Sequence, residues 1–219
     1  MVNDQREAAA ERRGETDRVK AFTDAVIAII MTILVLEIGV PPNLSDERLI
    51  DALDETWPEM AAWMISFLIT GMYWVWHRDL FNQMRVVNRT VVWLNLLFLL
   101  PLALVPFGAS VLGEYPQDPI GLRVYGAVLL VTGLVRMLLY VYVMRRPILL
   151  YQTPTAQHRR VGGLLASAPI GIYLLAMLVA GLSPALSLAL YLGVPVLYLL
   201  LIAALRRHPS TSQEAQDFG

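Results

Sequence analysis

The sequence predicts an all-α membrane protein with six transmembrane helices. The chain of 219 residues is 57% hydrophobic and 16% charged, whereas soluble domains average roughly 25% charged residues. Apolar runs of about 20 residues, the length needed to cross a bilayer, recur along the chain. Polar or turn-forming segments such as GVPPNLSDE, HRDLFNQMRVVNR and GEYPQDPIG separate these runs.

The predicted spans form one transmembrane domain over residues 18–207, between an N-terminal tail of residues 1–17 and a C-terminal tail of residues 208–219. Prolines within three of the spans are expected to kink them. The spans lie at about residues 19–40, 57–80, 91–113, 120–144, 161–182 and 184–206.

The distribution of charge predicts that both termini are cytoplasmic. Of the 17 basic residues, 14 lie in the two tails, at the span ends beside them, and in the second and fourth connections. Cytoplasmic segments of membrane proteins carry such an excess of Lys and Arg. The opposite face is acidic, and it either concentrates cations or simply collects acidic residues where basic ones are excluded. Its acidic residues are Asp46, Glu47, Asp51, Asp54, Glu55, Glu59 and Glu114.

Several classes of function are disfavoured by composition. A net charge of −1 gives no reason to expect a nucleic-acid partner, and the absence of cysteine excludes thiolate metal sites and cysteine nucleophiles. No paired carboxylates, His-Glu helix motif or serine with a base occurs within a span, so we expect no enzyme activity and no cofactor.

Polar side chains from three spans are predicted to meet near the cytoplasmic side. With the orientation above, Asp24 in the first span, His77 in the second and Asn95 in the third lie at one depth. Polar groups in a bilayer face the bundle and find partners. We therefore predict a network of these three residues, closed by Arg18 or Thr23. It serves either as an interhelical clamp or as a proton relay or ion-coupling site.

The first span carries an apolar stripe on another face. At about 100° per residue, Ile29, Ile33 and Leu36 fall within about 40° of one direction, and Thr32 lies beside them. Phe22 and Arg18 extend this stripe toward the cytoplasm, whereas Asp24 lies about 140° away. The stripe is either an ordinary packing or lipid-facing surface or a hydrophobic pore constriction.

A single arginine, Arg136, lies inside the predicted fourth span. A voltage sensor needs arginines repeated along a helix. The sequence therefore leaves two interpretations, in which Arg136 either extends to the interface or pairs with a neighbouring subunit or a lipid.

Arg18, Phe22, Thr23 and Asp24 form the motif Arg-x-x-x-Phe-Thr-Asp at the start of the first span. With threonine in place of serine, this motif matches the Arg-x-x-x-Phe-Ser-Asp signature of the transmembrane protein 175 family of potassium-permeable channels, which the first half of the chain resembles. The continuation AVIAIIMTILVLEI and the segments YWVWH and LNLLFLLPLALVPF are also similar to the family. The resemblance is specific over about residues 18–107.

This resemblance implies a potassium-preferring cation channel in the cell membrane of a prokaryote. It implies a homotetramer in which the first helix of each subunit lines a central pore, without the P-loop of ordinary potassium channels. The constriction would lie at Ile29, Ile33 and Leu36, with Thr32 as a flanking selectivity residue. The network that holds the pore helix would comprise Arg18, Phe22, Thr23, Asp24, Trp74, His77 and Asn95. The alternative function is a proton- or cation-coupled secondary transporter that uses Asp24 and His77.

Overall fold

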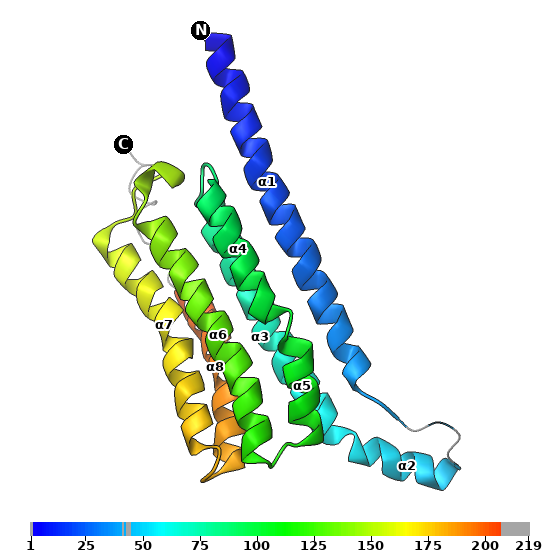
Figure 1. Ribbon diagram of the computed structural model, residues 1–219. Helices are drawn as coiled ribbons and strands as arrows, with labels where there is room; N and C mark the ends of the chain where they lie inside the picture. Colours follow the sequence, from blue (N-terminus) through cyan, green and yellow to red (C-terminus); the bar gives the residue numbers. More distant parts are fainter. Residues whose placement is uncertain (1, 41, 43–44, 207–219) are drawn as a thin grey trace, which may run out of the picture.

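The computed structural model describes residues 2–40, 42 and 45–206 and consists of helices (Figure 1). The predicted C-terminal tail, residues 208–219, lies outside the described residues. In chain order the elements are α1 (Val2–Ile33), the 3-10 helix η1 (Leu34–Glu37), α2 (Asp46–Glu55), α3 (Trp57–Asn82), α4 (Arg89–Leu102), α5 (Val105–Glu114), α6 (Pro119–Met144), the 3-10 helix η2 (Pro147–Leu149), α7 (Ala156–Val179) and α8 (Pro184–Arg206).

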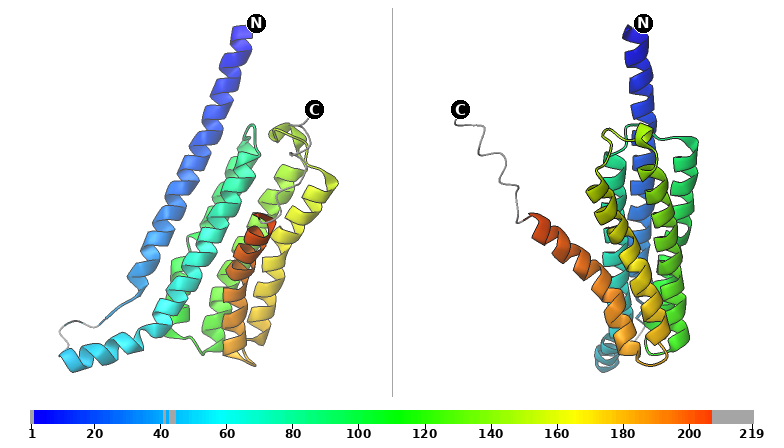
Figure 2. Two further views of the ribbon diagram at one scale, coloured as in Figure 1. Left: turned by 180° about the vertical axis from the view of Figure 1, so that it is seen from behind. Right: turned by 90° about the vertical axis from the view of Figure 1, so that its left-hand side faces the viewer.

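The long helices form an elongated bundle with α1 along one edge (Figure 1). Helix α6 packs against α4, α5 and α7, while α3 packs against α1, α5 and α8. The α3–α4 and α6–α7 connections lie at the end of the bundle toward the N-terminus, and α2 projects from the opposite end (Figures 1 and 2). The first of these ends is therefore basic and the second acidic, as the sequence predicted for the two faces.

Several predicted boundaries differ from the structure, among them those of the first span, the connection after it and the third span. The first helix begins at Val2 rather than residue 19, so the polar segment before the span is helical, and regular α-helix ends at Ile33 rather than residue 40. The predicted connection after it contains α2, which has one apolar face. The third span is two helices, because Pro101 and Pro106 lack the N–H groups that a continuous helix needs.

Length and composition indicate a multi-pass membrane protein. Among the described residues, four segments are long and apolar enough to cross a bilayer: Gly14–Glu37, Arg89–Glu114, Pro119–Met144 and Ala156–Val179. Residues Pro184–Leu200 form a shorter apolar helix. Helix α3 is less apolar, but its buried side chains from Ala62 to Phe81 place it at the centre of the bundle.

Four tyrosines build the core where α3, α6, α7 and α8 meet: Tyr73, Tyr125, Tyr173 and Tyr191 are all fully buried. Ser66 and the hydroxyl of Tyr125 are 2.9 Å apart, and Tyr191 donates to the Leu122 carbonyl at 2.8 Å. The latter bond requires a gap in α6, which Gly126 provides. A Cβ at residue 126 would overlap the hydroxyl of Tyr191 and the Met177 side chain.

We predict that Gly126→Ala destabilises the bundle by about 1–3 kcal/mol, the usual cost of overpacking a core. Gly171→Ala in α7 is the matched control, since nothing lies within 4 Å of a Cβ at that position. Thermal unfolding in detergent measures both, and equal midpoints for the two variants would show that the gap at Gly126 is not needed.

Candidate functional site

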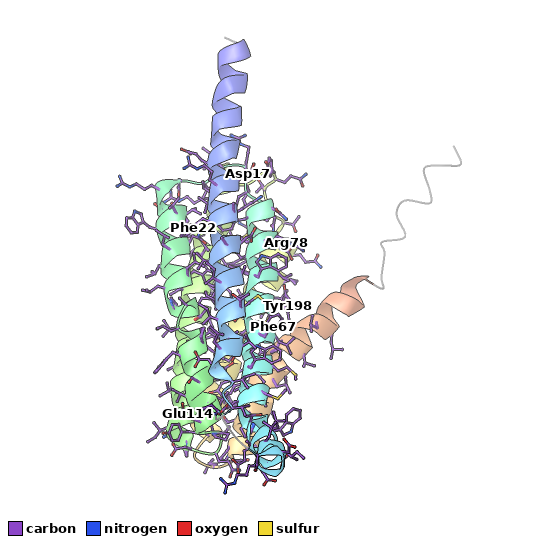
Figure 3. The ribbon with its side chains drawn as sticks, turned by 90° about the vertical axis from the view of Figure 1, so that its right-hand side faces the viewer. Asp17, Phe22, Phe67, Arg78, Glu114 and Tyr198 are labelled. Carbon is purple, nitrogen blue, oxygen red and sulfur yellow. The ribbon has the colours of Figure 1, made fainter. Side chains whose placement is uncertain are left out.

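Helix α1, continued by η1, has two faces that differ sharply in burial. Ile27, Ile30 and Leu34 pack into the bundle and are 1%, 5% and 0% exposed. On the other face Ile29 is 56% and Leu36 is 76% exposed. In Figure 3, α1 runs along the front of the bundle and no other helix covers it. The predicted apolar stripe therefore lies on the open face of α1.

The other residues of the stripe are exposed as well. Phe22 is 51% and Ile33 is 40% exposed. Thr32 is exposed beside them, and its hydroxyl donates to the Ile29 carbonyl at 2.9 Å. That bond uses the hydroxyl proton, so the oxygen lone pairs remain available on the open face.

A chain of hydrogen bonds attaches the other face of α1 to α4 and α3. The Asn95 side-chain Nδ2 donates to Thr23 Oγ1 at 2.8 Å, and His77 Nε2 lies 2.9 Å from Asn95 Oδ1. All three side chains are essentially buried. Asn88 sets the register of α4, because its side chain accepts from the Val91 N–H and caps the helix two turns before Asn95.

The direction of this chain follows from its first member. Thr23 donates its hydroxyl proton to the Val19 carbonyl at 3.0 Å, so toward Asn95 it can only accept. Asn95 therefore presents its amide nitrogen to Thr23 and its oxygen to His77. That oxygen needs a donor, so His77 must carry a proton on Nε2. The helix contacts thus determine which ring nitrogen of His77 is protonated.

The imidazole of His77 is held in an aromatic stack. The Phe81 ring centroid lies 4.1 Å from that of His77, and the Phe98 ring lies nearly parallel at 6.2 Å. Sequence reasoning missed both phenylalanines. They follow His77 and Asn95 by four and three residues, the spacing of one helix turn, and that spacing is the signal that could have identified them.

Asp24 differs from its predicted place in the network. Its carboxylate accepts a hydrogen bond from Trp74 Nε1 at 2.8 Å and is solvent-exposed. Asn95 is joined to Thr23 instead, since Thr23 faces the bundle and Asp24 lies at the edge of that face. Separate side-chain hydrogen bonds therefore hold α1: Thr23 is bonded to α4, while Asp24 and Lys20 are bonded to Trp74 and Asn82 of α3.

Arg18 and Phe22, the other signature residues, lie outside these hydrogen bonds. Arg18 is exposed and lines a surface pocket with Asn88 and Arg89. Figure 3 shows Phe22 near the same end of the bundle as Asp17 and Arg78, and far from Glu114. The signature thus divides between the attached face of α1 and its open face.

Arg136 is 2% exposed and lies inside the subunit rather than extending to the interface. Its guanidinium lies 4.8 Å from the centroid of the Trp76 ring, and it donates to backbone carbonyls of α7. This burial contradicts extension to the interface, whereas pairing with a neighbouring subunit or a lipid stays a prediction.

Residues 18–106 match the family described as the endosomal/lysosomal potassium channel TMEM175. A structure of a lysosomal potassium-selective channel TMEM175 homologue from Chamaesiphon minutus superposes with a TM-score of 0.74 at 27% identity. The superposition covers 85% of this chain and 97% of the chain of the homologue. The first half of the chain is therefore similar to the TMEM175 family.

Two curated relatives give the extent of the TMEM175 similarity. A potassium channel of Streptomyces collinus is 40% identical over 114 residues, which is 52% of this chain and 55% of the relative. The endosomal/lysosomal proton channel TMEM175 of Danio rerio is 30% identical over 136 residues, covering 61% of this chain and 26% of the relative. The chain thus spans about half the length, or less, of these relatives.

We predict that Thr23→Val lowers the unfolding temperature and that Thr23→Ser largely preserves it. Valine has nearly the shape of threonine but leaves the buried Asn95 amide without its acceptor, at a cost of about 1–3 kcal/mol. Serine retains the hydroxyl. Differential scanning fluorimetry in detergent measures both variants, and equal stability of the valine and serine variants would show that this hydrogen bond does not hold α1.

Proposed function

We propose that the chain is the subunit of a potassium-preferring cation channel and that α1 lines its pore. The observation that carries the proposal is the open apolar face of α1, opposite the face attached through Thr23. Similarity to the TMEM175 family over residues 18–106 supports it, since relatives of this chain are named potassium channels.

The proposed assembly is a homotetramer in the cell membrane of a prokaryote, with six spans per subunit and both termini in the cytoplasm. Four subunits would place four open α1 faces around one axis and cover the exposed Ile29, Ile33 and Leu36. The connections rich in Arg lie at one end of the bundle, and this supports the proposed orientation.

The proposed neck works by partial dehydration. Branched apolar side chains cannot replace the water around an ion, as the carbonyl rings of other potassium channels do. A narrow ring of Ile29, Ile33 and Leu36 would therefore close by steric contact and dewetting, and when open would favour the cation that loses water more readily. This mechanism gives modest preference for potassium over sodium, tuned by Thr32 at the flank.

The outer entrance is expected to be acidic. Asp46, Asp51, Asp54 and Glu55 are exposed on α2 or at its ends. Carboxylates at a pore entrance raise the local cation concentration, and the effect weakens as salt screens it. The permeant ion is the substrate of the proposed channel, and we propose no resident cofactor.

The alternative, a coupled transporter that uses Asp24 with His77, has less support. Asp24 is hydrogen-bonded to Trp74, whereas His77 is hydrogen-bonded to Asn95. A relay requires a hydrogen-bonded path between the two groups, and these bonds lead to different helices.

We predict that Ile29→Ala raises single-channel potassium conductance and lowers the potassium-to-sodium permeability ratio, because it widens the proposed neck. Ile30→Ala is the matched control: it is the same substitution one residue on, but Ile30 is buried in the bundle. The control should lower stability by about 2–5 kcal/mol and leave the permeability ratio unchanged. Planar bilayer recordings under a potassium gradient measure both.

Two outcomes would contradict the proposal. Flux by the wild-type protein that depends on a proton gradient, without unitary currents, would favour the transporter. Unitary currents with the same permeability ratio in wild type and Ile29→Ala would retain the channel but remove Ile29 from its neck.

A further inference from the structure

Arg136 is a buried cation with an unusual set of partners. It lies on α6 about two turns from the basic end, and its guanidinium faces the rings of Tyr73 and Trp76 at 5.7 and 4.8 Å from their centroids. Nη2 donates to the carbonyls of Leu165 and Ala166 on α7. These contacts leave the charge far from the open face of α1.

The carbonyl of Leu165 is available because of a proline. Pro169 lies four residues after Leu165 inside α7 and has no N–H to donate to it. Arg136 replaces the missing backbone bond. The pairing explains why an arginine is tolerated between two apolar helices, but carbonyl dipoles and aromatic faces do not neutralise a full charge.

Among the described residues, the positive charge of Arg136 is only partly compensated. No carboxylate lies within salt-bridge distance of Arg136 among these residues, and its buried Nε has no hydrogen-bond partner there. A buried charge without a counter-charge costs several kcal/mol. The arrangement therefore favours binding of an anion beside Arg136.

A cavity of about 50 Å³ lies beside this guanidinium. Its wall includes Arg136, Ala168, Pro169, Ile172, Val194 and Tyr198. One water needs roughly 10–15 Å³ of such space, so the cavity admits a group of a few atoms. Helix α8 leans away from the bundle beyond this level, as Figures 2 and 3 show, so the cavity lies where α8 begins to separate from α3.

We propose that this cavity binds one small monovalent anion, a halide or a carboxylate, which supplies the missing counter-charge of Arg136. The anion joins α6 and α7 to α8 near the cytoplasmic end of the bundle. The site does not depend on the proposed channel function, because none of its groups lies on the open face of α1.

The test is thermal unfolding of the detergent-solubilised protein in potassium bromide or chloride against potassium gluconate at equal ionic strength. Gluconate carries a polyhydroxylated chain, which the largely apolar wall of the cavity disfavours, so it serves as the reference anion. A saturable rise in unfolding temperature of about 3 °C or more is expected when the halide reaches tenfold its dissociation constant. Octanoate added to gluconate buffer, with octanol as the uncharged control, separates a lipid carboxylate from an inorganic anion as the source.

Three variants make the result specific. Arg136→Gln should abolish the halide-dependent shift, whereas Arg123→Gln should retain it, because Arg123 is also on α6 and donates to a carbonyl of α7 but is exposed. Ala168→Leu fills the cavity while Arg136 remains, and it should also abolish the shift. If Arg136→Gln does not fold, the unfolding temperature of Ala168→Leu tests the anion site without it.

Equal unfolding temperatures in halide, octanoate and gluconate would overturn the proposal, as would an undiminished shift in Ala168→Leu. In crystals grown with bromide, an anomalous peak beside Arg136 is the expected direct result where the source is inorganic. If octanoate alone stabilises the protein, the carboxylate is the ligand.

Discussion

The hydrogen bond from Asn95 to Thr23 is the interaction on which the arrangement of α1 depends. A helix with apolar residues on nearly every side has no strong preference for which side it turns inward, because lipid and protein interior are similarly apolar. A buried amide that must find an acceptor removes this freedom. With Thr23 directed into the bundle, Ile27, Ile30 and Leu34 follow it inward, and Ile29, Ile33 and Leu36 must face outward.

His77 extends this constraint to α3. Its Nε2 proton is needed by Asn95, and its ring stacks with those of Phe81 and Phe98. The polar chain and the aromatic stack therefore support one another at a single depth. The Asp24–Trp74 bond gives α1 a second attachment to α3, so its rotation is held from two directions.

The sequence predicted the two-faced character of α1 and a polar network of Asp24, His77 and Asn95 at one depth, closed by Arg18 or Thr23, because both follow from helix periodicity and topology. It placed Trp74 in the same network as Asp24 but did not identify the two as partners, since a small rotation of α1 decides whether residue 23 or 24 faces Asn95. The sequence also did not predict the surroundings of Arg136. The carbonyl freed by Pro169 becomes relevant only once α6 and α7 are known to be neighbours.

The rotation of α1 can be tested most directly with silver ions, which bind thiolates strongly. The chain has no cysteine, so Ile29→Cys and Ile30→Cys each introduce a single thiol, one on the open face and one on the attached face. Single-channel recording should show irreversible block by silver in Ile29→Cys and none in Ile30→Cys or the wild type. Block of Ile30→Cys with Ile29→Cys unaffected would contradict the account.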